Sequence, residues 1–160
     1  MFMKTAIIYS SKYGTTEKVA RIIARKIEAE NDVTLIPLAD TPAPDISGYE
    51  KIILGTSIYA GKSRANMRKF CKKYGSVLNE KIIGLFVCGM QSAKKAEELR
   101  DAYPEKLHNI AKAEDYMGGE FLLEKMNFLV SQFVRRLEKT EISVSKLDYD
   151  AIDVFSNKMK

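Results

Sequence analysis

The chain has 160 residues, the size of a protein with a single core, and we expect one domain over residues 1–160. The chain has a hydrophobic content of 46%, no apolar run near the ~20 residues of a membrane span, no cleavable leader and only two cysteines. These features exclude membrane-spanning and disulfide-rich secreted proteins, and predict a cytoplasmic location. The net charge of +5 suits nucleic acid, an anionic membrane surface or an anionic ligand, but we attribute most of it to solvated helix faces.

Apolar segments typical of strands alternate with helical patterns along the chain. Strands are expected at residues 4–10, 32–38, 50–57 and 80–89, with a fifth near 115–119. Helices are expected at Thr15–Ala29, at Ser63–Tyr74, from about Ala93, and at the end of the chain from about Ser145. Residues 39–50 hold two of the four prolines and are expected to form a loop or a single turn.

Three of the first four strand segments are almost continuously apolar, which indicates strands that are buried on both faces. Their alternation with helices predicts an α/β fold, in which helices cover both faces of a parallel sheet. In such folds ligands bind at the carboxyl ends of the strands. The loops that follow the strands are therefore the places where a site is expected.

The loop in YSSKYGTTEKVA, residues 9–20, joins the first strand to the first helix. Gly14 permits a backbone turn that other residues resist, which aims the amides of residues 11–16 at the space before the helix N-terminus. Further donors come from the hydroxyls of Ser10, Ser11, Thr15 and Thr16. Such a loop can bind a phosphate ester, although an ordinary N-cap by serine or threonine explains the pattern equally well.

Neither of the two commonest nucleotide fingerprints is present. The first loop lacks the G-x-G-x-x-G pattern of dinucleotide folds. TSIYAGKS, residues 56–63, resembles a P-loop but has Thr56 where glycine is needed. Its bulky Ile58–Tyr59 pair, and the lack of a strand that ends in a magnesium-binding aspartate, argue against a nucleotide hydrolase.

Two further loops follow the third and fourth strands. Tyr59, beside Ala60 and Gly61, offers a ring that can stack on a flat ligand, although a tyrosine covering the sheet edge is the commoner case. The loop in VCGMQS, residues 87–92, has a glycine that lets its backbone approach the same ligand. One anion-binding loop and two loops around a planar group describe a site for flavin mononucleotide (FMN).

With IIYSSKYGTTEKVA, ILGTSIYAGK and FVCGMQS, the chain resembles the flavodoxin family. The resemblance implies a three-layer α/β/α fold, with five parallel strands in the order 2-1-3-4-5, and a noncovalently bound FMN. By position, Ser11, Gly14 and Thr16 match the phosphate loop, Tyr59 matches the stacking aromatic residue, and Cys88–Gln91 match the loop at the ring edge. The chain departs from the family at Tyr13, a bulky residue whose backbone amide can still donate.

The expected cofactor-binding residues are Ser10, Ser11, Lys12, Tyr13, Gly14, Thr15, Thr16, Ser57, Ile58, Tyr59, Ala60, Gly61, Cys88, Gly89, Met90 and Gln91. No catalytic side chain or metal site is expected, because the flavin supplies the redox chemistry. Within this set, Lys12 either offsets the phosphate charge or faces water. The sequence identifies no base that would activate the Cys88 thiol.

Within the superfamily, the chain resembles the menaquinone-dependent protoporphyrinogen oxidase branch in two respects. It is basic, whereas carrier flavodoxins are acidic and dock on basic partners. It also has an extra amphipathic segment, GGEFLLEKMNFLVSQFVRRLEK, between the fifth strand and the last helix. The resemblance implies an FMN that takes hydride equivalents from a porphyrinogen and passes them to a quinone.

Two alternatives remain open. The chain can be a flavodoxin-type electron carrier between redox proteins, with no substrate of its own. The extra segment at 121–139 can pack on the domain, form a homodimer, or contact a membrane surface peripherally. No stretch with the basic and aromatic pattern of a nucleic-acid site is present.

Overall fold

A computed structural model describes residues 2–121 and 144–160. Its main sheet contains five parallel strands in the order β2-β1-β3-β5-β6. These strands are β1 (Met3–Ser10), β2 (Asn31–Pro37), β3 (Lys51–Tyr59), β5 (Ile82–Cys88) and β6 (Ala111–Tyr116). Counted along the chain, this is the expected order 2-1-3-4-5, which is confirmed.

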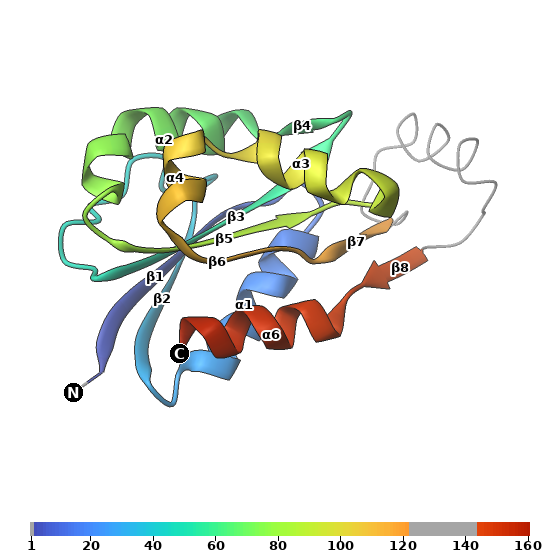
Figure 1. The fold of residues 1–160 in the computed structure, drawn as a ribbon. Coiled ribbons are helices and arrows are strands. Elements are labelled where there is room, and N and C mark those ends of the chain that lie inside the picture. Colours follow the sequence, from blue (N-terminus) through green and yellow to red (C-terminus); the bar gives the residue numbers. More distant parts are fainter. Residues whose placement is uncertain (1, 122–143) are drawn as a thin grey trace.

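Two short antiparallel elements lie at the carboxyl ends of these strands (Figure 1). Strand β4 (Lys62–Ser63) folds back on β3, with Tyr59 opposite Lys62. Strands β7 (Gly118–Phe121) and β8 (Val144–Leu147) form a separate two-stranded ribbon, in which Phe121 lies opposite Val144. Neither element was expected from the sequence.

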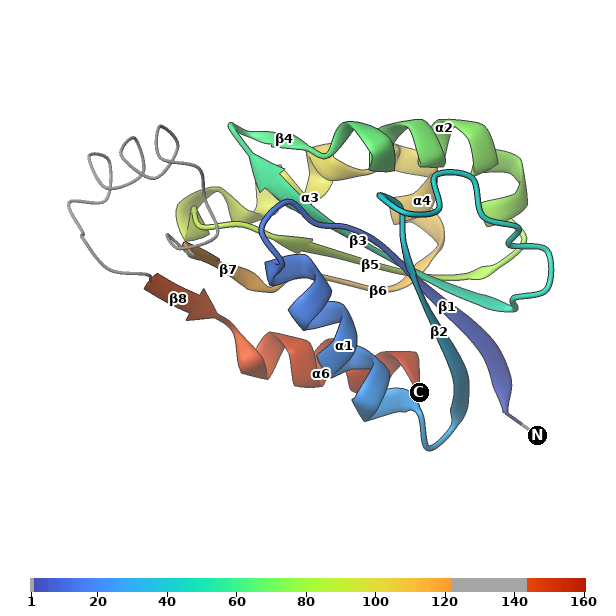
Figure 2. The same cartoon turned by 180° about the vertical axis from the view of Figure 1, so that it is seen from behind.

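Helices cover both faces of the sheet, as Figures 1 and 2 show from opposite sides. One face carries α1 (Thr15–Ile27) and α6 (Tyr149–Met159). The other carries α2 (Ala65–Leu78), α3 (Lys95–Ala102) and α4 (Glu105–Ile110), and a short 3₁₀ turn at Ser92–Lys94 precedes α3. The three-layer α/β/α architecture is therefore confirmed.

The buried strands explain why the sheet needs helices on both sides. Ile7 of β1 packs in the cluster under α1 and α6, whereas its neighbour Ile8 packs in the cluster under α2, α3 and α4. The same alternation places Ile53 and Leu54 of β3 in different clusters. Each buried aliphatic side chain contributes roughly 1.5–3 kcal/mol, so both helical layers stabilise the sheet.

Three expected elements differ from the structure. The helix expected from Ala93 is broken into α3 and α4 at Pro104, which adopts an extended conformation before α4. The fifth strand begins at Ala111 rather than near 115, and its polar sequence AKAEDY reflects its place at the edge of the sheet. The last helix begins at Tyr149 rather than Ser145, because Asp148 caps it by accepting a hydrogen bond from the Ala151 amide.

The connection between β2 and β3 is irregular, as expected for residues 39–50, and its Ile46 is buried against the core. The extra amphipathic segment expected at 121–139 lies, beyond Phe121, outside the described residues. Within the described part of the chain, no helix has the length and apolar character needed to cross a membrane.

A buried cluster of polar side chains lies at the amino ends of the strands. The ammonium of Lys51, which is 1% exposed, donates to Asn31 Oδ1 (2.9 Å) and to the Met159 carbonyl of α6. The same Asn31 oxygen accepts from the Thr5 hydroxyl at 2.8 Å. Burial lowers the pKa of Lys51. Three strands and the last helix are thus joined at one buried group.

We predict that Gly55→Ala lowers the free energy of unfolding by about 1–3 kcal/mol, because the new methyl group would overpack the core. A Cβ on Gly55 would lie 2.0 Å from Cζ of Phe86, on the neighbouring strand. The measurement is urea denaturation followed by circular dichroism. The control is Gly75→Ala in α2, where no atom lies within 4 Å of the new Cβ. Replacing this helical glycine should raise the free energy of unfolding by about 0.5–1 kcal/mol. Equal stability changes for the two variants would contradict the packing argument.

Candidate functional site

The loop between β1 and α1 turns at Gly14, whose φ of 96° lies in the left-handed region. Gly14 is the N-cap residue of α1, and no side chain caps this helix. The interpretation of the loop as an ordinary serine or threonine cap is therefore wrong. The Gly14 amide donates instead to Ser11 Oγ at 3.0 Å, and the Ser10 hydroxyl is hydrogen-bonded to Asn66 of α2.

One pocket brings the three expected loops together at the carboxyl ends of the strands. Most of the expected residues line it, namely Ser11, Lys12, Tyr13, Thr15, Thr16, Ser57, Ile58, Tyr59, Cys88, Gly89 and Met90. Gly119 and Glu120 of β7 complete the lining. Ser10 and Gly14 support the first loop from outside the pocket. Ala60, Gly61 and Gln91 line a separate cavity of about 240 Å³ beside α3.

This pocket has a volume of about 80 Å³, and a side chain of the first loop lies over one of its aromatic rings. The Lys12 ammonium lies 4.0 Å from the centroid of the Tyr59 ring and 5.3 Å from that of Tyr13. These distances are typical of cation–π contacts. A flat ligand that stacks on this face of Tyr59 therefore has to displace Lys12. Lys12 is exposed to solvent as well as in contact with the Tyr59 ring, so both roles considered for it stay open.

The polar groups of the pocket fit a phosphate ester. Three hydroxyls that belong to its lining, those of Tyr13, Thr16 and Ser57, are buried without a hydrogen-bond partner among the described residues. A buried polar group without a partner costs about 1–3 kcal/mol, and a ligand oxygen could remove this cost. The N-terminus of α1 also favours an anion at this position. The residues present therefore fit a ligand that combines a phosphate with a flat ring.

A family model described as a flavodoxin domain matches residues 6–148 of the chain. The chain belongs to the flavodoxin domain family. An uncharacterised protein of Methanocaldococcus jannaschii is 34% identical over 108 residues, which are 65% of this chain and 68% of that protein. These matches give no support to the resemblance to protoporphyrinogen oxidases.

Solved structures show the same fold. An archaeal flavodoxin is 21% identical, with 99% of this chain and 100% of that chain covered and a TM-score of 0.53. A Fusobacterium nucleatum flavodoxin bound to FMN is 19% identical, with coverage of 69% and 68% and a TM-score of 0.53. Rubredoxin:oxygen oxidoreductase from Desulfovibrio gigas is 17% identical, with a TM-score of 0.56; the match covers 98% of this chain but 37% of that protein.

The Cys88 side chain of this flavodoxin domain is buried in the core. It is 2% exposed and packs in the core cluster with Tyr9 and Met117. Burial raises the pKa of the Cys88 thiol to about 12, so the thiol stays protonated at neutral pH. The buried and protonated thiol therefore gives no support to a nucleophilic role for Cys88.

Two residues of the β7–β8 ribbon, Gly119 and Glu120, line the pocket, although the sequence did not predict them as site residues. The Gly89 amide donates to the Gly118 carbonyl at 2.9 Å, and a Cβ on Gly119 would lie 2.7 Å from the Gly89 carbonyl oxygen. Glu120 forms an ion pair with Lys18 of α1 at 3.2 Å. The two consecutive glycines after the fifth strand were the signal that the backbone approaches another loop closely here.

Two buried polar residues, Tyr116 and Glu98, pack against the loop that follows β5. The Tyr116 hydroxyl accepts the Gln91 amide at 3.1 Å. The Glu98 carboxyl, on a residue that is 5% exposed, lies beside this hydroxyl, and both crowd Gly89. Burial raises the pKa of Glu98 and of Tyr116. No signal in AKKAEELRDA marks Glu98 as buried, because its neighbours have the composition of a solvated helix.

We predict that Glu98→Gln is more stable than the wild type near neutral pH. Because burial places the pKa of native Glu98 above its ordinary value of 4.5, ionisation of this group opposes folding. The difference in the free energy of unfolding should grow as the pH rises above about 4.5 and vanish below it, where the carboxyl is protonated in both states. Urea denaturation over this pH range measures it. The exposed neighbour Glu97, changed to Gln, should show no such trend, and a similar trend there would remove burial as the cause.

Proposed function

We propose that this flavodoxin domain binds FMN noncovalently and acts as a redox protein. The observation that carries the proposal is the single pocket in which the loop at the α1 N-terminus meets the loops after β3 and β5. Bound FMN supplies the transfer of one or two electrons. The protein would supply a place for the phosphate in the loop that turns at Gly14 and a stacking surface for the ring at Tyr59.

The side chains of the site bind and orient rather than react. The first-loop amides and the Thr16 hydroxyl would hold the phosphate, and Lys12 would leave the Tyr59 ring and offset the phosphate charge. Tyr59 is 41% exposed, so a ring stacked on it stays accessible to a partner or a small substrate. The pair of Tyr116 and Glu98 would hold the loop that borders the ring.

We predict that Gly14→Val abolishes FMN binding. A β-branched residue strongly disfavours a φ of 96°, so the loop amides would no longer point at the phosphate. Absorption in the flavin bands after incubation with FMN and removal of free ligand is the measurement. Gly48→Val serves as the control, because nothing lies within 4 Å of a Cβ at that position. A colourless wild-type protein that takes up no FMN would refute the proposal itself.

Tyr59→Ala should weaken FMN binding by about 1–3 kcal/mol, the usual contribution of an aromatic ring stacked on a planar base. Tyr59→Phe keeps the ring and should bind FMN as the wild type does. Quenching of flavin fluorescence on titration gives the dissociation constants. If Tyr59→Ala binds with unchanged affinity, Tyr59 covers the sheet edge and does not stack.

An oxidoreductase of the quinone-linked protoporphyrinogen oxidase type is the specific activity that we propose. It is supported by the basic composition and by the place where the extra segment is inserted, between β7 and β8. Glu120 lines the pocket, and the inserted segment follows one residue later. A segment inserted there can line the approach to the flavin, and its Arg135 and Arg136 can attract the carboxylates of a porphyrinogen.

An electron carrier is the second candidate, and the chemistry of the pocket favours it. Among the described residues of its lining, the Cys88 thiol is protonated and the Glu120 carboxylate is paired with Lys18, so neither is suited to proton transfer at neutral pH. Transfer of single electrons between proteins needs no such group. The oxidase candidate requires the inserted segment for its activity, whereas the carrier candidate does not.

We predict that replacing residues 122–143 by Asn-Gly leaves FMN bound and abolishes quinone-dependent oxidation of protoporphyrinogen. Phe121 and Val144 lie opposite each other in the ribbon, so a two-residue turn can close it without disturbing the pocket. The assay uses FMN-loaded protein, protoporphyrinogen and a menaquinone analogue without oxygen. If the intact protein turns over no faster than free FMN, the carrier function stands and the oxidase type is refuted.

A further inference from the structure

The positive charge of the chain is concentrated around one helix. Residues 52–79 contain six lysines and arginines and no aspartate or glutamate, although the whole chain has 26 basic and 21 acidic residues. On and just before α2, most of these side chains are exposed, and Arg64 is half-buried. We call this surface the basic face; it consists of Lys62, Arg64, Arg68, Lys69, Lys72 and Lys73.

This arrangement of charge opposes the stability of α2. Arg64, Arg68 and Lys72 follow one another at a spacing of four residues, and like charges at that spacing repel each other along a helix. The first turn of α2 has no acidic residue, whereas α1, α3, α4 and α6 each have at least one there. Cations near a helix N-terminus are unfavourable. A partner of opposite charge would relieve both effects.

The basic face is not neutralised within the structure. Among residues 2–121 and 144–160, none of the ion pairs involves a side chain of this face. Arg68 donates to the Ser63 carbonyl, and the Lys73 ammonium lies 5.5 Å from the Tyr74 ring centroid, so neither meets a carboxylate. Within the part of the chain that the structure describes, the charges of this face therefore meet no carboxylate and can act on a molecule that approaches from outside.

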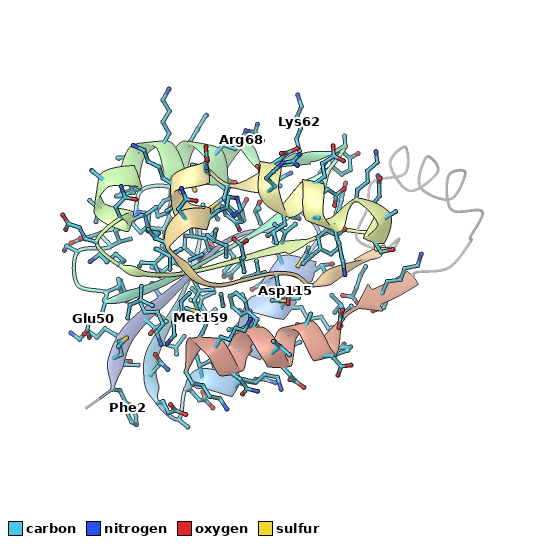
Figure 3. All side chains as sticks on the ribbon, in the orientation of Figure 1. Phe2, Glu50, Lys62, Arg68, Asp115 and Met159 are labelled. Carbon is cyan, nitrogen blue, oxygen red and sulfur yellow. The ribbon has the colours of Figure 1, made fainter. Side chains whose placement is uncertain are left out.

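The basic face adjoins the pocket. Lys62 lies directly opposite Tyr59 in the β3–β4 hairpin, and the Lys12 ammonium lies against the Tyr59 ring from the other loop. Figure 3 shows Lys62 and Arg68 on the outer side of the α2 layer, near this hairpin. A molecule bound along α2 would thus reach the exposed edge of Tyr59.

The chemistry of the face selects a protein rather than a lipid bilayer or a nucleic acid. The apolar side of α2, with Met67, Phe70 and Leu78, is buried in the core, so the helix has no apolar stripe to insert into a membrane. Within α2 itself, Tyr74 is half-buried and packs on Phe70, so this helix displays no ring for a base to stack on. The property of this face that remains to attract a partner is its positive charge, and charge steers the association of proteins.

We propose that the basic face is the docking surface for an acidic electron-transfer protein, whose carboxylates pair with the lysines and arginines of α2. This inference rests on the proposed redox function and adds the chemistry of the partner. Docking there brings the partner's redox centre to the Tyr59 edge of the pocket. The partner has the opposite charge to the basic partners on which acidic carrier flavodoxins dock.

The test compares two charge-reversed variants of the full-length protein. Lys69→Glu with Lys72→Glu changes the basic face, and both side chains are exposed. Arg25→Glu with Lys158→Glu changes the net charge equally on α1 and α6, which cover the opposite face of the sheet. The probe is a dye-labelled acidic [2Fe–2S] ferredoxin. Fluorescence anisotropy measures its binding at about 20 mM and about 300 mM NaCl, which span the range over which surface charges become screened.

We expect the ferredoxin to bind the wild type at low salt and to be released at high salt, and the α2 variant to bind at least ~10-fold more weakly than the control variant. Equal weakening by both variants, or by neither, overturns the proposal. Stronger binding to phosphatidylserine vesicles or to labelled single-stranded DNA, lost in the α2 variant, also overturns it in favour of those ligands. Anisotropy does not require bound flavin, so flavin absorption of the same samples separately reports failure of the proposed function.

Discussion

The register of the three central parallel strands decides where the site lies. Ser10, the last residue of β1, lies opposite Thr56 of β3, and Ser57 lies opposite Cys88, the last residue of β5. Strands in this register end along one line, so the loops that follow them begin side by side. Apolar packing against the helices fixes the register, because a slip by one residue would turn Ile7 away from its core.

The sequence was most informative where burial is continuous. The strands β1, β3 and β5 are apolar on both faces, and their positions and order agree with expectation. The three loops after them contain glycines and hydroxyl residues at recognisable positions, and the structure brings these loops to one pocket. Local composition was sufficient for these elements because the same residues both form the strand and fill the core.

Elements at the edge of the fold were less predictable, because partners distant in sequence define them. Strand β6 is polar and lacks the apolar pattern of a buried strand, and Val144–Leu147 is a strand only because β7 pairs with it. Glu98 is buried because Tyr116 and Gly89 pack around it, which its own helix does not reveal. The composition predicts positive charge scattered over solvated faces, whereas α2 and the residues just before it carry six lysines and arginines and no acidic residue.

The buried Lys51 has a consequence for following the fold chemically. Its ammonium is held between Asn31 and the Met159 carbonyl at the end of the molecule opposite the pocket, and it cannot reach solvent while α6 stays docked. An amine-reactive reagent should therefore label the exposed lysines at once and Lys51 only when this end opens. The rate at which Lys51 is labelled therefore measures how often the last helix undocks. Mass spectrometry follows this rate without any mutation.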